Sequence, residues 1–172
     1  MPRIPIEITY MQVAYQFAKL SYASRRKVGC VIVKENQVIS FGYNGTPKGF
    51  DNECEEINIE TKYYENPDVA IILEEDGFAC NDGCCTKETQ VTKREVLHAE
   101  SNAIMKVAKS TMSCEGATLY TTTCPCFDCA KLIIQSGISE VYYTEDYRDM
   151  SGVELLQKAN ITTKQVNTWN EF

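Results

Sequence analysis

From Lys27 onward, short β-rich runs alternate with segments of helical periodicity, and this order constrains the fold more than any other feature. The runs 27–34 and 37–43 are separated only by the polar pair Glu35-Asn36, a spacing typical of a β-hairpin. Helix and strand then alternate, which predicts a mixed sheet with helices on both faces. The expected helices are 8–22, 98–109, 126–136 and 152–159, and the later expected strands are 117–122, 141–144 and 161–166.

The domain organisation follows from length and from one irregular stretch. A chain of 172 residues suits one domain, residues 1–172, with room for a hydrophobic core. Residues from about 50 to 95 are acidic and mostly aperiodic, with a short strand or helical turn expected at 69–73. We interpret this stretch as an insertion into the domain rather than a separate domain. So short a segment rarely forms a hydrophobic core of its own unless a disulfide or a bound metal stabilises it.

Charge and hydropathy exclude several classes of protein. The 17 basic and 24 acidic residues give a net charge of −7, which argues against a protein that grips nucleic-acid phosphates. No stretch approaches the roughly 18–20 apolar residues that a membrane span needs, and the start lacks the apolar core of a signal peptide. We therefore expect a cytoplasmic protein with neither a nucleic-acid nor a membrane partner.

The nine cysteines point to metal binding or catalysis. Nine is an odd number, so full pairing into disulfides within one chain is impossible. Without a secretion signal, clustered cysteines indicate metal ligation more often than a disulfide framework. Cys30, within an apolar run, and Cys114 are interpreted as structural residues.

Two short motifs at predicted helix starts carry the candidate chemistry. His98-Ala-Glu100 opens one helix, and Pro125-Cys126-Phe-Asp-Cys129 opens another. Cys126 and Cys129 lie one helical turn apart, so both sulfurs can reach one ion, and His98 is the only histidine. One nitrogen and two sulfurs leave the fourth position of a tetrahedral zinc open to water, which is the catalytic arrangement.

Glu100 is the candidate proton carrier. Glu100 lies two residues from His98, so on a helix its side chain points in a different direction from that of His98. It can therefore lie over the water at the fourth zinc position rather than bind the metal. A carboxylate base is useful here because two thiolates weaken the acidifying effect of zinc on water. A zinc-bound water with a carboxylate base beside it is the arrangement that hydrolytic deamination uses. In that reaction, water replaces an exocyclic amine on an amidine-like ring carbon. A non-catalytic module stabilised by zinc is the alternative, since each motif alone is a weak signal.

Together, the order H-x-E then P-C-x-x-C matches the zinc-deaminase signature. The chain resembles the cytidine/deoxycytidylate deaminase superfamily, specifically deoxycytidylate (dCMP) deaminases of the phage and eukaryotic type. The matching segments are 27–33, 42–49, 98–105 and 124–138. The resemblance implies an α/β/α fold with a sheet of about five strands, and conversion of dCMP to dUMP and ammonia for thymidylate synthesis. A polynucleotide base deaminase acting on tRNA or single-stranded DNA is the alternative, disfavoured by the acidic charge.

The resemblance also implies regulation, assembly and specific residue roles. It implies a homo-oligomer, usually a hexamer, activated by dCTP and inhibited by dTTP with magnesium, in the host cytoplasm if the chain is viral. His98, Cys126 and Cys129 hold zinc, and Glu100 shuttles protons. For the substrate it implies three residues: Asn44 for the sugar, Lys109 for the 5′-phosphate and Tyr147 to close over the nucleotide. The alternative role of Asn44 is to stabilise the turn in which it lies. The alternative for Lys109 is that it is only a charged side chain exposed to solvent.

Two further sites are hypotheses. Some phage relatives bind a structural zinc, which here would need four sulfurs, those of Cys54, Cys80, Cys84 and Cys85; reduced loop thiols are the alternative. An effector triphosphate with Mg²⁺ is expected at the glycine-containing turn 44–49, where backbone N–H groups can approach phosphates. The residues expected at that effector site are Arg26, Lys27, Gly45 and Lys48.

Overall fold

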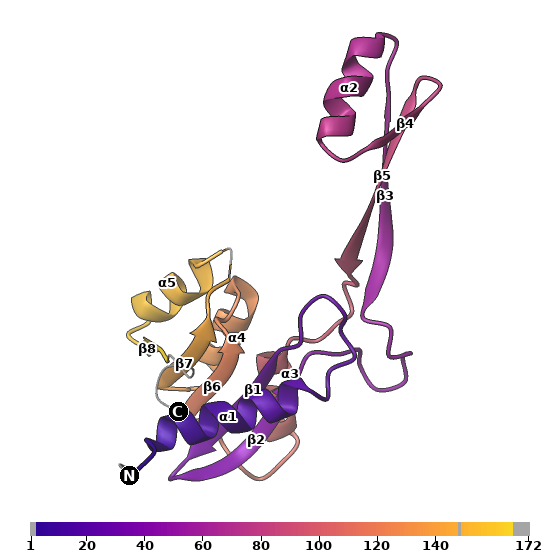
Figure 1. Cartoon of the computed structure of the whole chain (residues 1–172). Helices are drawn as coiled ribbons and strands as arrows, with labels where there is room; N and C mark the ends of the chain where they lie inside the picture. The colour runs from indigo at the N-terminus through magenta and orange to yellow at the C-terminus, as the bar shows by residue number, and fades with distance from the viewer. Residues whose placement is uncertain (1–2, 148, 167–172) are drawn as a thin grey trace.

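The computed structural model describes residues 3–147 and 149–166, and its body is built on one five-stranded sheet (Figure 1). The strand order is β2-β1-β6-β7-β8. β1 is antiparallel to both of its neighbours, whereas β6, β7 and β8 are parallel. The bounds are β1 (Gly29–Lys34), β2 (Gln37–Tyr43), β6 (Thr118–Thr123), β7 (Glu140–Glu145) and β8 (Thr162–Gln165). The predicted mixed sheet is confirmed.

Helices cover both faces of this sheet, as the order of the elements predicted. They are α1 (Ile6–Ala18), α3 (Ala99–Ala108), α4 (Phe127–Gln135) and α5 (Ser151–Lys158). Side chains of β1 alternate between the two faces. Val31 packs with Met11 of α1, whereas Ile32 joins a larger core cluster to which α3, α4 and α5 all contribute. The result is a three-layer α/β/α arrangement.

Two glycines allow helices to lie directly on the strands. A Cβ at Gly29 of β1 would lie 2.0 Å from the carbonyl oxygen of Ala14 in α1. A Cβ at Gly42 of β2 would lie 2.0 Å from the carbonyl oxygen of Ala99 in α3. No side chain fits at such distances, so these positions set how closely α1 and α3 approach the sheet.

The segment between β2 and α3 forms a second, three-stranded sheet that projects from the body (Figure 1). β3 (Glu55–Tyr63) pairs antiparallel with β5 (Cys84–Thr92) along its whole length, and β4 (Ala79–Asn81) pairs with the start of β5. We call residues 55–92 the arm. Although its sequence is mostly aperiodic, the arm consists of two nine-residue strands, a short third strand and a helix.

The tip of the arm has its own small core. The short apolar run expected at 69–73 lies in helix α2 (Pro67–Glu75), whose start is capped by the Asn66 side chain. Leu73 and Phe78 pack there against Cys85, which forms a disulfide with Cys80 on the neighbouring strand. The tip thus combines a few apolar contacts with a covalent staple.

A helix that spans a membrane must be both long and apolar. Within residues 3–147 and 149–166, no helix is both long enough and apolar enough to cross a bilayer.

Candidate metal and catalytic site

Three metal-binding side chains meet where α3 and α4 begin. Nδ1 of His98 lies 3.3 Å from Sγ of Cys126 and 3.4 Å from Sγ of Cys129. His98 is the N-cap residue of α3, and Cys126 is the N-cap residue of α4. Within the described part of the chain, this is the only group of three or more His, Cys, Asp or Glu residues close enough to hold an ion.

The start of α4 favours a thiolate. A hydrogen bond from the Cys129 thiol is the main cause that lowers the pKa of Cys126, to about 4. The same hydrogen bond, together with burial, raises the pKa of Cys129. The partial positive charge of a helix N-terminus adds to the stabilisation of an anion at Cys126.

This donor set fits zinc. One imidazole nitrogen and two thiol sulfurs are the ligands that zinc prefers, and all three atoms lie within 4.8 Å of one another. A fourth protein ligand does not join them among the described residues. The arrangement is therefore that of a catalytic rather than a closed structural site.

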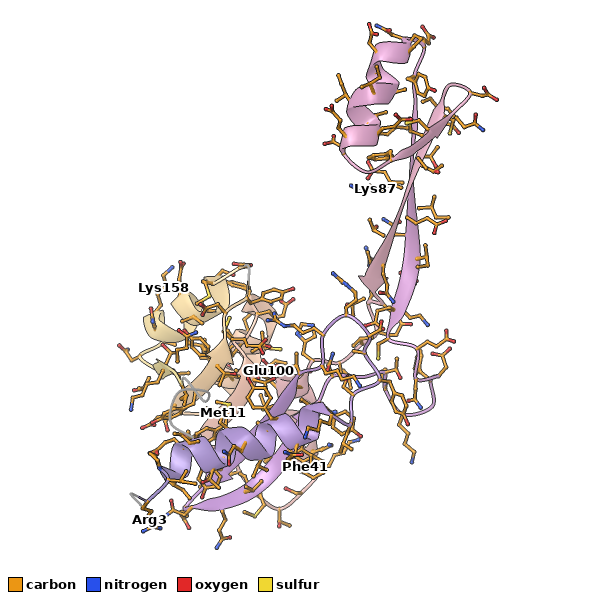
Figure 2. The ribbon with its side chains drawn as sticks, viewed as in Figure 1. Arg3, Met11, Phe41, Lys87, Glu100 and Lys158 are labelled. Carbon is orange, nitrogen blue, oxygen red and sulfur yellow. A yellow bond between two sulfur atoms is a disulfide. The ribbon has the colours of Figure 1, made fainter. Side chains whose placement is uncertain are left out.

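Glu100 lies beside the three ligands, in the first turn of α3 (Figure 2). Its side chain is only 4% exposed, and its Oε2 accepts a hydrogen bond from the Cys129 thiol at 3.6 Å. Burial is the main cause that raises the pKa of the Glu100 carboxyl, although a hydrogen bond from its own backbone N–H and the charge of His98 oppose it. A carboxyl group with a raised pKa next to a metal site is suited to carry a proton during catalysis.

A cavity of about 490 Å³ opens over these residues. His98 and Glu100 lie in one part of its wall, and Cys124 and Tyr147 follow the ends of the parallel strands β6 and β7. The base of the arm and the segment before β1 complete the wall. Among the charged and hydroxyl side chains that they contribute, Arg25, Glu55 and Thr92 were not assigned to any site from the sequence. The volume suits a ligand the size of a nucleotide.

Tyr147 lies in the cavity wall, as its expected role at the nucleotide requires. Its backbone N–H donates to the Sγ of Cys124 at 3.1 Å, and its ring lies 5.9 Å from the guanidinium carbon of Arg26. Arg26 in turn forms a 2.7 Å ion pair with Glu145. Tyr147 is thus held from two sides while its side chain remains 39% exposed.

Asn44 also lines the cavity, but its amide is engaged within the protein. Its Oδ1 accepts from the backbone N–H of Val28 at 2.8 Å, and its Nδ2 donates to the carbonyl oxygen of Arg26 at 2.9 Å. These contacts support the alternative interpretation of Asn44 as the residue that holds the turn, and they leave one amide hydrogen for a ligand.

Lys109 does not reach the cavity of its own chain. It is the C-cap residue of α3, whereas the cavity lies at the opposite end of that helix. Nine residues of α-helix from Glu100 correspond to roughly 14 Å. The expectation that Lys109 contacts the substrate phosphate is therefore not met within one chain.

The four residues expected at an effector site do not form one. Arg26 belongs to the cavity that also holds His98 and Glu100. The backbone N–H of Gly45, which was expected to face phosphate, donates instead to the carbonyl oxygen of Leu97 at 3.1 Å. The side chains of Lys27 and Lys48 are exposed and do not line the cavity.

The four cysteines proposed for a second zinc are also not brought together. Cys80 and Cys85 are joined in a disulfide at the tip of the arm, with Cys84 beside them. Cys54 is buried at the base of the arm with Ala23 and Val96. The seven residues of β3 that separate the two ends correspond to roughly 23 Å, so the four sulfurs cannot share an ion.

The fold, the ligand set and the buried carboxyl define the class of the zinc-dependent nucleobase deaminases. Residues 6–145 match the family described as the cytidine and deoxycytidylate deaminase zinc-binding region. The chain belongs to this family, and the expected resemblance is confirmed.

Named relatives and solved structures agree with this assignment. The deoxycytidylate deaminase of Enterobacteria phage T4 is 37% identical over 149 residues, covering 81% of this chain and 77% of the relative. The deoxycytidylate deaminase of Saccharomyces cerevisiae is 34% identical over 168 residues, and there the chain spans only 45% of the relative. The crystal structure of dCMP deaminase from the cyanophage S-TIM5, in complex with dCMP and dUMP, superposes with a TM-score of 0.73 at 33% identity. That match covers 96% of this chain and all of the other.

Proposed function

We propose that this chain catalyses the hydrolytic deamination of dCMP to dUMP and ammonia. The observation that carries the proposal is the buried carboxyl of Glu100 beside the ligand set of His98, Cys126 and Cys129, at a cavity of nucleotide size. The named function of the relatives that match most of the chain supports the choice of substrate.

In the proposed mechanism, His98, Cys126 and Cys129 hold the metal. Zinc bound there supplies a Lewis acid that makes water nucleophilic at neutral pH. Glu100 would take one proton from the attacking water and deliver it to the ring nitrogen, where it stays in dUMP. It would then take the remaining proton of the hydroxyl added to the ring carbon and deliver it to the amine, which leaves as ammonia while the carbonyl forms. The buried position of Glu100 supports this relay, because burial raises the pKa of its carboxyl and so lets it bind a proton more readily than an exposed carboxyl does.

The remaining parts of the proposal concern substrate, regulation and place. Tyr147 closes over the nucleotide, and the free Asn44 amide hydrogen contacts its sugar. The product dUMP feeds thymidylate synthesis, with dCTP as activator, dTTP with Mg²⁺ as inhibitor and a homohexamer as the working assembly. Because the substrate is a charged nucleotide of the free pool, we place the reaction in the cytoplasm.

Ammonia release from dCMP, deoxycytidine, single-stranded DNA and tRNA tests this proposal. We expect turnover of dCMP to exceed that of the other substrates, and dCTP and dTTP to change the rate in opposite directions. Preference for a polynucleotide would contradict the proposal, and so would a protein that binds zinc but releases no ammonia from any of the four.

A further inference from the structure

The wall of the cavity carries two cationic side chains in addition to the metal ligands. Among the described residues that line it, the permanent cations are Arg25 and Arg26, both from the segment just before β1. A nucleoside monophosphate carries two negative charges that need such a partner. Since Lys109 lies at the far end of α3, the phosphate partner has to be sought at these two residues.

Arg26 is already committed to other groups. Its Nη2 lies 2.7 Å from Oε2 of Glu145, and its guanidinium faces the ring of Tyr147 at 5.9 Å. A phosphate that recruited Arg26 would have to compete with this carboxylate. We therefore regard Arg26 as a residue that positions Tyr147.

Arg25 is differently placed. Its side chain makes one hydrogen bond, from Nη1 to the neutral hydroxyl of Thr92 at 3.2 Å. Within residues 3–147 and 149–166, no carboxylate lies within ion-pair distance of it. The nearby carboxylate of Glu55 is held instead by two backbone N–H groups, those of Ser24 and Arg25, at 3.1 and 3.2 Å. The guanidinium charge of Arg25 thus remains uncompensated in the cavity wall, with most of its five donors free.

We propose that Arg25 binds the 5′-phosphate of the substrate and so makes the enzyme select nucleotides over nucleosides. The proposal rests on the proposed deamination of dCMP. A planar guanidinium can donate two parallel hydrogen bonds to a phosphate, and the hydrogen bond to Thr92 holds the group at the base of the arm. The arm therefore contributes to substrate recognition through β5.

The test compares Arg25→Gln with Arg94→Gln, a variant with the same charge change at an exposed position outside the cavity. For Arg25→Gln we expect kcat/KM for dCMP to fall about 10- to 100-fold, the range for loss of a charged hydrogen bond. The value for deoxycytidine should stay within about twofold of the wild type. Arg94→Gln should leave both values unchanged, and Arg25→Lys should recover part of the loss because it restores the charge without the fork.

A binding experiment separates this inference from the proposed function. The affinities of the zinc-loaded wild type and of Arg25→Gln for dUMP and for deoxyuridine are measured by calorimetry, which needs no turnover. We expect Arg25→Gln to lose affinity for dUMP alone. An equal effect on dUMP and deoxyuridine, or an unchanged ratio of kcat/KM for dCMP and deoxycytidine, would overturn the assignment of Arg25. A wild type that binds dUMP through Arg25 but does not deaminate dCMP would instead contradict the proposed function alone.

Discussion

The Oε2 atom of Glu100 lies 3.6 Å from the Sγ of Cys129, although the two residues are separated by a strand and by the connections on either side of it. One residue follows the N-cap of α3 by two positions, and the other lies in the first turn of α4. Their contact exists because α3 and α4 begin at the same end of the sheet. The proposed proton carrier and the candidate metal ligands are thereby placed side by side.

Glu100→Gln separates these two roles. We expect turnover of dCMP to fall by at least about 100-fold, and up to about 10,000-fold, because the amide cannot carry the proton. Zinc content should not change, since His98, Cys126 and Cys129 remain. Steady-state rates and metal analysis check this, with the exposed Glu95→Gln as the control. Retention of wild-type turnover would show that Glu100 is not the proton carrier.

Gly42→Ala and Gly45→Ala form a matched pair, one position in β2 and the other two residues beyond its end. A Cβ at position 42 would lie 2.0 Å from the carbonyl oxygen of Ala99 at the start of α3, whereas a Cβ at position 45 meets nothing within 4 Å. We expect Gly42→Ala to cost about 1–3 kcal/mol of stability and to weaken zinc binding, because α3 must shift. Thermal unfolding and zinc titration measure both effects. Equal stability of the two variants would contradict the close approach of α3 and β2.

Asn44→Ala tests whether this side chain holds the loop before β1. The change removes the partners of the Val28 N–H and the Arg26 carbonyl, so we expect a loss of about 1–3 kcal/mol. In a chain of this size that lowers Tm by about 2–4 °C for each kcal/mol. Asn52→Ala, at an exposed position, serves as the control. An unchanged Tm with a higher KM would assign Asn44 to the substrate alone.

Metal stoichiometry distinguishes one zinc site from two. We expect one zinc per chain, bound by His98, Cys126 and Cys129, because the arm cysteines do not converge on an ion. Replacing both Cys80 and Cys85 by Ser should leave this number unchanged, whereas Cys126→Ser should abolish it. Elemental analysis of the purified proteins gives the answer, and two zinc ions per chain would contradict the arrangement of the arm.

Apolar periodicity and turn chemistry were enough to predict most of the body. The hairpin of β1 and β2 could be located because Glu35 and Asn36 form a two-residue turn, and both adopt positive φ. The candidate metal ligands could be predicted because Cys126 and Cys129 are one helical turn apart and His98 is the only histidine in the sequence. Both signals are local, since they depend only on spacing along a strand or a helix.

The arm and the far wall of the cavity were decided by tertiary structure. Ile57 and Ile59 alternate with polar residues in β3, a local strand signal that the interpretation of this stretch as aperiodic missed. The pairing of β3 with β5 and the exposure of both strands outside the body depend on tertiary structure. Arg25 meets Thr92 only because the base of the arm lies against the segment before β1. A contact between segments so far apart does not depend on residue spacing within either segment. It depends on the packing of the whole chain, so neither segment's sequence predicts it.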